Sequence, residues 1–483
     1  MVYALMKNTT TAMIVFCLVL LKGPASAQEF FQLPGVIHVQ TSFDDSGLYS
    51  IDQLVAVAKE KGMEFIVPTD HDLQVMEYGV FPFRNLIKKR EERNSVIKLG
   101  PEKYLAEINR ANQKQNEVLV IPGVQSSPFY YWTGSPFSGD LTAHEFRKEF
   151  LLIGMRTSED YLSLPILHRG FSTHYTKELL LQSFVFLAAL VLSVYLVIQK
   201  GTLRILGCIV GFFSLALLIN HHPFQSSLFD PYHGDQGIKP FQELIDYVNE
   251  RKGLVFWAHP ESNYAVNGVQ LGPVKLMTKH YPEDLIASTG YTGFEAIYGD
   301  NITATDPGKQ WDHVLKAYCQ GDRSSPVWGI SGADFRGQKN DDAFGTYQTI
   351  LLVKNKSTDD VLEALSSGRF YAIRKGNGSR LSIDHFKVKD KDTDSLAIMG
   401  GEIDIKKFPV LTFKLSATDG DHYNINVVVV RGGEVIKSFH GETPLSFCFV
   451  DKDQWTGKTF YRLEVRGSSV GRLFSNPIFA VKK

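Results

Sequence analysis

Two uncharged apolar stretches near the middle of the chain constrain its fold more than any other feature. Residues 179–198 (LLLQSFVFLAALVLSVYLVI) contain no charge and match the roughly 20 residues that a helix needs to cross a bilayer. Residues 205–219 are slightly short, but the span extends through Leu203 when Arg204 reaches back to the interface. This pattern predicts a two-helix transmembrane hairpin over residues 179–220. The alternative is a buried helical hairpin of a soluble protein.

The ends of these helices and the start of the chain indicate an orientation. Lys200 and Arg204 lie in the connecting turn, and positively charged loops face the cytoplasm. Lys7, an apolar run and the small residues at 25–27 (ASA) predict a signal peptide over residues 1–27, with an uncleaved anchor as the alternative. We therefore expect a membrane-anchored protein with its main domains on the extracytoplasmic face of the plasma membrane.

Composition excludes some functions and sets the scale of the fold. A chain of 483 residues is long enough for two or more domains. Its formal net charge of −1, without a basic stripe, argues against a nucleic-acid partner. Cys319 and Cys448 are expected in separate domains, so we predict no disulfide framework.

Strands and helices alternate on both sides of the hairpin. Predicted strands cover residues 35–40, 63–72, 117–125, 254–262, 293–299 and 327–337, with amphipathic helices at 50–62, 101–115, 238–253 and 310–321. The alternation predicts a parallel α/β domain over residues 28–178 and 221–378, interrupted by the hairpin. From about Ser379 short alternating strands with turn signals predict an all-β sandwich over residues 379–483, a structural companion without a chemical constellation.

Two other segments have simpler interpretations. Lys88, Lys89 and Arg90, with Arg93, predict a solvated helix face. The aromatic residues at 128–134 (PFYYWTG) predict either the rim of a substrate pocket or a contact with lipid.

Polar residues gather where the predicted strands end. Imidazole and carboxylate groups from separate strand ends are the ligands of Zn²⁺, Mn²⁺ and Fe sites, and parallel α/β domains place their sites at the C-terminal ends of strands. The sequence therefore predicts a metal site at one end of the sheet. The candidate residues are His38, Gln40, Asp44, Asp45, Asp70, His71, Asp72, Gln125, His259, Asp334 and Arg336.

The motifs IHVQTSFDDSG, FIVPTDHD, VLVIPGVQ, VFWAHPE and GISGADFRG follow in that order between about residues 35 and 375. Together they resemble the polymerase and histidinol phosphatase (PHP) superfamily, and most closely its carbaryl-hydrolase-like branch, CehA/McbA. The C-terminal segment ending in SNPIF is also similar to that branch. The resemblance implies a distorted (β/α)₇ barrel whose strand ends hold up to three metal ions that activate water against phosphoesters.

The same resemblance implies roles for individual residues. His38 matches the first His of the H-x-H motif and Asp45 the acid of S-D-G. His71 matches the His of T-D-H, His259 the His of the H-P motif, and Asp334 the acid of the last D-x-H.

Four positions depart from the family pattern. Gln40 stands where the second His is expected, Gln125 where a Glu bridges two metals, and Arg336 where the last His is expected; Glu149 or Phe150 lies near the place of a further His. A neutral amide lacks the negative charge that lets two cations sit close together. A guanidinium has no lone pair and repels a cation. The sequence therefore predicts a site with one divalent ion, at most two, or none.

Two functional hypotheses, and a structural one, remain open at this stage. In the first, a phosphoesterase-like hydrolase with a reduced site binds Zn²⁺, Mn²⁺ or Fe²⁺ through ligands drawn from His38, Gln40, Asp45, His71, Gln125, His259 and Asp334. His71 and His259 act in catalysis, and Arg336 binds a small anionic phosphate ester. In the second, the chain is an inactive PHP-fold protein that binds an anion without metal. In the third, these polar residues only satisfy one another. The sequence leaves the oligomeric state open.

Overall fold

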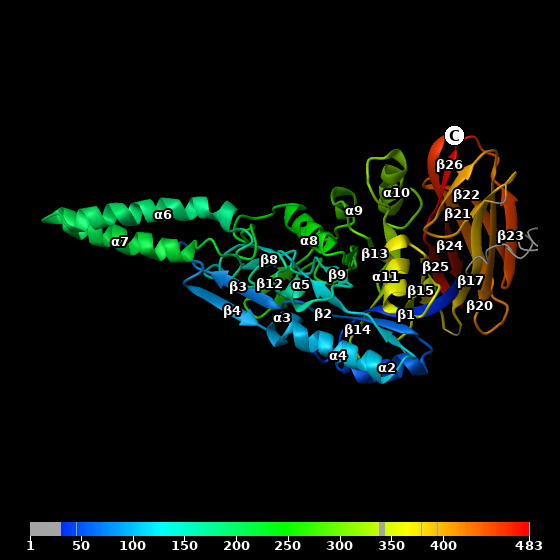
Figure 1. The fold of residues 1–483 in the computed structure, drawn as a ribbon, viewed down its shortest axis with the longest axis horizontal. Helices are drawn as coiled ribbons and strands as arrows, with labels where there is room; N and C mark the ends of the chain where they lie inside the picture. The colour runs from blue at the N-terminus through cyan, green and yellow to red at the C-terminus, as the bar shows by residue number, and fades with distance from the viewer. Residues whose placement is uncertain (1–29, 45, 338–342, 378, 394, 483) are drawn as a thin grey trace, which may run out of the picture.

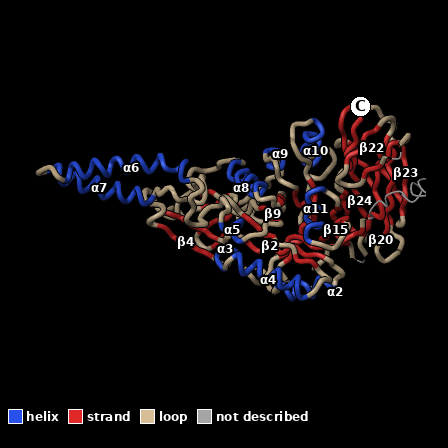
Figure 2. Tube along the Cα trace, in the orientation of Figure 1, coloured by secondary structure: helices blue, strands red, loops and turns tan. Residues whose placement is uncertain are grey.

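The structure is a computed structural model that describes residues 30–44, 46–337, 343–377, 379–393 and 395–482. The molecule is elongated, with a helical hairpin at one end, a barrel in the centre and a β-sandwich at the other end (Figure 1). Helices flank the central strands, whereas the C-terminal part consists of strands and loops (Figure 2). The predicted signal peptide, residues 1–27, and Asp45 lie outside the described residues.

Seven strands close into a barrel, because β1 pairs with β14 on one side and with β2 on the other. Neighbouring strands are parallel except around β9, which is antiparallel to both β6 and β10. All seven residues of β2 are buried, as expected for a strand covered on both faces. In spatial order the strands are β1 (Phe31–Val39), β14 (Trp328–Phe335), β13 (Gly293–Ile297), β10 (Leu254–Trp257), β9 (Phe150–Ile153), β6 (Gly123–Ser126) and β2 (Phe65–His71).

Amphipathic helices cover the barrel, and their buried sides join its hydrophobic core. Local sequence determines where two of these helices begin. Ser50 and Gln53 form a capping box at the N-terminus of the helix 51–60, and Pro101 is the first residue of the helix 101–114. The helices are α2 (Ile51–Glu60), α3 (Val96–Leu99), α4 (Pro101–Lys114), α5 (Ser158–Leu162), α8 (Lys239–Glu250), α9 (Asp284–Ala287), α10 (Gln310–Gln320) and α11 (Thr358–Ser367).

The hairpin consists of α6 (Thr176–Val197) and α7 (Thr202–Asn220), which project away from the barrel (Figure 1). Both helices are long and apolar enough to cross a membrane, and little of their surface is buried. A Cβ added at Gly211 would lie 2.9 Å from Ser193 Oγ, so the small residue allows the helices to approach closely. The hairpin is inserted between β9 and β10, which are neighbours in the barrel.

Two small sheets are built from segments that connect barrel strands along the chain. The β3–β4 hairpin pairs β3 (Val75–Gly79) with β4 (Lys88–Glu92). A second sheet contains β7 (Tyr131–Thr133), β8 (Thr142–His144), β11 (Val269–Leu271) and β12 (Val274–Met277). The prediction of a helix face around Lys88–Arg90 is therefore wrong. These side chains belong to a strand, and two of them pair with buried Glu77 on β3.

The C-terminal sandwich packs two sheets around a second hydrophobic core. Arg462 ties it to the barrel: its Nε and Nη2 donate to the two carboxylate oxygens of Asp312 on α10 at 2.8 and 2.9 Å, with both side chains fully buried. One sheet contains β17 (Leu381–Asp390), β18 (Leu396–Ala397), β20 (Pro409–Ala417) and β23 (Leu445–Val450). The other, which continues from the barrel through β15 (Tyr347–Val353) and β16 (Phe370–Lys375), contains β19 (Glu402–Ile405), β21 (Asn424–Arg431), β22 (Glu434–Glu442), β24 (Gly457–Gly467), β25 (Gly471–Ser475) and β26 (Ile478–Lys482).

The predicted mixture of α and β structure is confirmed, with a closed seven-stranded barrel and two apolar helices. The expected all-parallel order is not fully met. β9 is antiparallel because the connection from β6 runs through β7 and β8, without the crossover helix that a parallel pair needs. The predicted strand 117–125 is split into β5 (Leu119–Val120) and β6 around Pro122, which has no N–H to donate.

Candidate functional site

The barrel brings the predicted site residues together at one end. Three of them have left-handed backbone conformations at or beside strand ends: His38 with φ 68°, His259 with φ 29° and Asp334 with φ 41°. A non-glycine residue held in this region costs about 1–3 kcal/mol and persists only where surrounding contacts enforce it. Such strain concentrates at ligand-binding and catalytic sites, which makes this end of the barrel the candidate site.

His38 forms a buried ion pair with Glu295 of β13. His38 Nδ1 lies 2.7 Å from Glu295 Oε1, and the two side chains are 0% and 1% exposed. Gly332 on the intervening strand β14 makes room for the carboxylate, because a Cβ there would lie 1.8 Å from Glu295 Oε1. Burial lowers the pKa of His38, but Glu295 and then Asp334 outweigh it and raise that pKa to about 9. The imidazole is therefore a cation near neutral pH.

Gln125 links the two sides of the site. Its Oε1 accepts from Gln40 Nε2 at 2.7 Å and lies 3.3 Å from His38 Nε2. Its Nε2 donates to Glu149 Oε2 at 2.6 Å. His38 and Gln40 thus reach the same partner, although the strand register shifts between Ile37 and Val39 and Gln40 lies just beyond the end of β1.

Glu149 occupies the position near which the sequence lacks an expected His. Its Oε2 lies 3.1 Å from His259 Nε2, and its Oε1 lies 3.3 Å from Arg147 Nη1. The His259 ring stacks on His38 with centroids 5.7 Å apart. Burial raises the pKa of Glu149, but the charges of Arg147 and His259 outweigh it and hold that pKa below its usual range. Glu149 is therefore a paired anion, whereas Phe150 lies in the apolar core.

Asp334 is half-exposed and bound by Arg336. Arg336 Nε and Nη2 donate to Asp334 Oδ1 at 3.1 and 3.0 Å, and His38 Nε2 lies 3.6 Å from the same oxygen. Burial raises the pKa of Asp334, but His38 and Arg336 keep it below its usual range. The guanidinium therefore shares the carboxylate that the resemblance assigns to a metal.

His71 lines the same cavity but is held by a different acid. Its Nδ1 lies 2.8 Å from Asp44 Oδ2, and its backbone N–H donates to that oxygen at 2.9 Å. Asp70 instead accepts from Thr41, and burial, with the charge of Asp44, raises its pKa to about 8. The structure thus assigns to Asp44 the contact with His71, while the role predicted for Asp45 falls outside the described residues.

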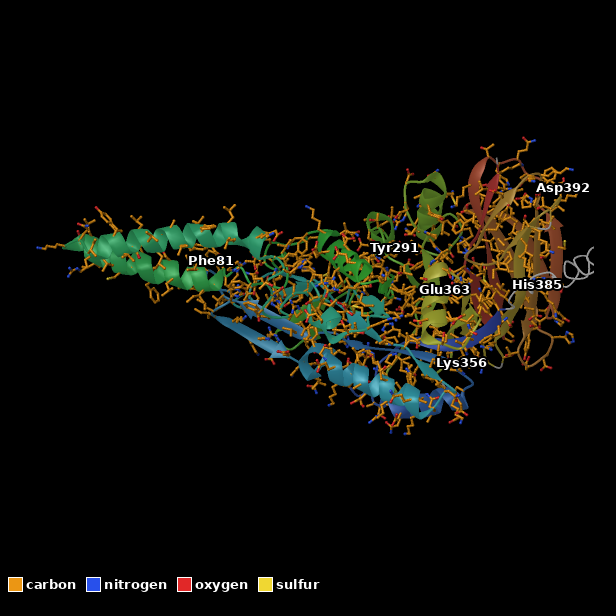
Figure 3. The ribbon with its side chains drawn as sticks, viewed as in Figure 1. Phe81, Tyr291, Lys356, Glu363, His385 and Asp392 are labelled. Carbon is orange, nitrogen blue, oxygen red and sulfur yellow. The ribbon has the colours of Figure 1, made fainter. Side chains whose placement is uncertain are left out.

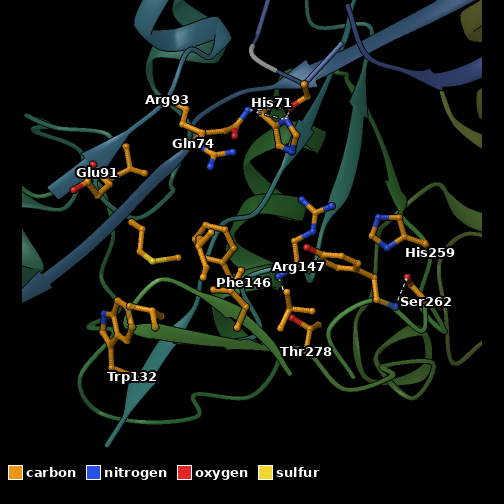
Figure 4. Close-up of a pocket in the computed structure, with 18 of the residues that line it drawn as sticks. His71, Gln74, Glu91, Arg93, Trp132, Phe146, Arg147, His259, Ser262 and Thr278 are labelled. Carbon is orange, nitrogen blue, oxygen red and sulfur yellow. Dashed lines mark hydrogen bonds between the residues drawn. The ribbon is translucent and has the colours of Figure 1, made fainter. Parts of the chain in front are cut away.

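A cavity of about 1520 Å³ opens at this end of the barrel, and His71, Asp334 and Arg336 are among the residues that line it. His71, Arg147 and His259 project into it from different elements, and Trp132 and Phe146 lie farther along its wall (Figure 4). Of the two predictions for the aromatic segment 128–134, the pocket rim agrees with the position of Trp132, whose side chain is almost fully buried.

A scan against protein-family models and a search of curated proteins both found no match for this chain. The PHP resemblance thus stays a prediction drawn from the motifs.

Some donor atoms of the site have the spacing that a divalent ion requires. His38 Nε2 lies 3.6 Å from Asp334 Oδ1 and 3.3 Å from Gln125 Oε1, near the roughly 3.4 Å between donors of a tetrahedral ion with bonds of about 2.1 Å. However, Arg336 occupies the Asp334 oxygen and Gln40 occupies the Gln125 oxygen. Over the described ranges, no three His, Cys, Asp or Glu side chains form a group that could hold a metal. As arranged, these residues do not fit a bound ion.

Sequence reasoning missed Glu295 and Arg147 as members of the site. Glu295 is fully buried within an otherwise apolar strand, and an isolated carboxylate in such a strand indicates a buried partner. This signal was present in the segment GFEAIYG. Arg147 follows a loop whose path only the tertiary structure defines, and no comparable signal marks it.

Proposed function

We propose that this protein is a membrane-anchored, extracytoplasmic PHP-type barrel protein whose pocket binds a small anion, a phosphate ester, without a resident metal ion. The observation that carries the proposal is the contact of Arg336 with Asp334, at the strand end where the resemblance expects the last metal ligands. A guanidinium in that place excludes a cation and attracts an anion.

The charges around the site support an anion rather than a metal. Three carboxylates of the site each lie beside a cation: Glu295 beside His38, Glu149 beside Arg147, and Asp334 beside Arg336. A metal centre instead needs uncompensated negative ligands to offset the charge of its ions. Arg336 and Arg147 use part of their hydrogen-bonding capacity on these carboxylates. Arg336 donates to Asp334 through Nε and Nη2, and a guanidinium carries five N–H donors, so it can also donate to a phosphoryl oxygen.

The direct test is binding of methyl phosphate to the full-length protein in a neutral detergent, measured by calorimetry with and without EDTA. We expect binding that EDTA does not change. Arg336→Gln should weaken it at least about tenfold, since a hydrogen bond to a charged group contributes roughly 1.5–3 kcal/mol. The matched control is Arg156→Gln, because Arg156 is 67% exposed and pairs with Asp359 outside the pocket. Failure of the unchanged protein to bind methyl phosphate would overturn the proposal.

A reduced metallohydrolase is the second candidate, and one observation favours it. Glu295 holds His38 Nδ1, so that His38 Nε2 faces Asp334 and Gln125; a carboxylate behind a histidine in this way orients many metal ligands. A bound ion would supply a water of lowered pKa and polarise a phosphoryl oxygen, and Arg336 would have to leave Asp334. Stoichiometric metal in the purified protein, with EDTA-sensitive release of phosphate, would favour this candidate over the first.

A further inference from the structure

The cavity extends well beyond the polar cluster at the barrel mouth. Asp334 and Arg336 line one part of it, while Val80 and Ile87, which flank the turn of the β3–β4 hairpin, line another. Its volume of about 1520 Å³ exceeds the roughly 300–1,000 Å³ that is common for small-molecule sites. A simple phosphate ester would leave much of this space unfilled.

Apolar side chains line much of this cavity: Met76 of β3, Trp132 of β7, Phe146, and Leu271 and Leu276 of the β11–β12 ribbon. Charged residues of β4 and its C-terminal neighbour, among them Glu91 and Arg93, also line it. Phe146 lies between Arg147 and Trp132 in the close-up (Figure 4). The apolar wall gains nothing from a hydrophilic ester but favours a hydrocarbon chain.

The apolar region lies at the base of the membrane hairpin. Val80 N–H donates to Ile87 O at 2.9 Å and so closes the turn. Within that turn, Asn85 bonds Asn220, the last residue of α7, through its backbone N–H at 2.8 Å and its side chain at 2.7 Å. Phe83 stacks on Phe213 of α7 with ring centroids 6.2 Å apart. The cavity thus reaches the segment that is attached to the transmembrane helices.

Exposed apolar side chains surround this base. Phe81 is 77% exposed, Ile87 57% and Phe171 70%. Phe171 stacks on Phe224, just beyond α7, with ring centroids 5.0 Å apart, and Phe81 lies beside the hairpin in the side-chain view (Figure 3). With α6 and α7 in a bilayer, these side chains lie at the height of its surface, where aromatic residues are favoured.

We propose that the ligand is an amphiphile of the adjoining leaflet, with a phosphate head group at Arg336 and a hydrocarbon chain along the wall between β3 and the β11–β12 ribbon. The chain enters from the bilayer at the β3–β4 turn. This inference rests on the proposed anion-binding function and specifies its ligand class.

The experiment uses the full-length protein in phosphatidylcholine nanodiscs, titrated with dodecyl phosphate and with methyl phosphate. Dodecyl phosphate should bind at least about tenfold more tightly than methyl phosphate. A tenfold gain requires the burial of only about two methylene groups of the chain. Leu271→Asp should weaken dodecyl phosphate at least about fivefold and leave methyl phosphate unchanged, because it places a charge only in the apolar wall. Arg336→Gln should weaken both ligands.

A matched control separates this effect from general destabilisation. Leu271 is 46% exposed, and Leu396 on β18 of the sandwich is 49% exposed, so Leu396→Asp should change neither affinity. Equal affinity for the two phosphates, or dodecyl phosphate binding that Leu271→Asp does not weaken, overturns the inference and leaves the anion site intact. Dodecyl phosphate binding that is insensitive to Arg336→Gln reflects partition into the bilayer and also overturns it. Failure of both phosphates to bind overturns the proposed function.

Discussion

His38 Nδ1 of β1 lies 2.7 Å from Glu295 Oε1 of β13, with β14 between the two strands. Gly332 of β14 allows the carboxylate to cross this gap, since any larger residue would collide with it. Glu295 Oε2 also accepts the backbone N–H of His259 at 2.7 Å. One buried carboxylate therefore fixes a side chain from β1 and the backbone that follows β10.

Glu295→Gln should destabilise the protein by about 3 kcal/mol. Removing one partner of a buried ion pair leaves the other charge unpaired, which typically costs 3–5 kcal/mol. Denaturant unfolding in detergent measures the change, and Glu363→Gln is the control because Glu363 is 61% exposed in its pair with Arg369. Equal stability of the two variants would show that the His38–Glu295 pair does not hold this site together.

Gln125→Glu combined with Arg336→His should convert the site into a metal centre. The new carboxylate would face Glu149, whose Oε2 now lies 2.6 Å from Gln125 Nε2, and two such anions in contact favour a cation between them. We expect bound Zn²⁺ or Mn²⁺ to increase to about one ion per chain or more by elemental analysis.

The control for this pair is Gln53→Glu with Arg156→His, both on the exposed surface. Unchanged metal content in the Gln125 and Arg336 variant would contradict the assignment of these two positions to former ligands.

Glu77 should make the region at the base of the α6–α7 hairpin sensitive to acid. Burial raises its pKa, but a hydrogen bond with His168 and the contact with Lys88 outweigh this and lower the pKa from 4.5 to about 2. Between pH 4.5 and about pH 2 the Glu77 carboxylate thus stays charged in the folded protein, whereas in the unfolded chain it takes up a proton. The resulting stability is present above pH 4.5 and is lost as the pH falls towards 2.

Trp132 reports on this region directly, because its indole N–H donates to Glu77 O at 3.0 Å. Thermal unfolding followed by tryptophan fluorescence should give a lower melting temperature for Glu77→Gln than for the unchanged protein at pH 6. This difference in melting temperature should shrink towards pH 2.5. A constant difference across this range would mean that the ionisation of Glu77 does not stabilise the fold.

The predicted membrane orientation places β23 outside and the α6–α7 turn inside. Cys448 on β23 is exposed and unpaired, so an impermeant maleimide should label it in intact spheroplasts. Lys200→Cys, in a Cys448→Ser background, should react only after the membrane is permeabilised. Labelling of Lys200→Cys in intact spheroplasts would reverse the orientation.

Much of the organisation followed from local sequence. Charge-free length alone predicted the two apolar helices, because a bilayer-spanning helix needs no tertiary partner to define it. Periodicity predicted α2, α4, α8 and α10 near their observed bounds. Periodicity did not predict β4, because this strand consists of charged residues and has no apolar pattern. Two of these residues, Lys88 and Arg90, pair with Glu77 on the neighbouring strand β3.

Local periodicity located the polar strand ends at His38, His71, His259 and Asp334, and the motif resemblance predicted a weakened metal site there. The partners of these residues came from the closed barrel: Glu295 behind His38, Glu149 beside His259, and a cavity that continues to the base of the hairpin. Strand ends follow from local periodicity, whereas the pairing of charges depends on which strands become neighbours in the barrel. In this chain β1 meets β13 only across β14, some 260 residues along the chain from His38 to Glu295.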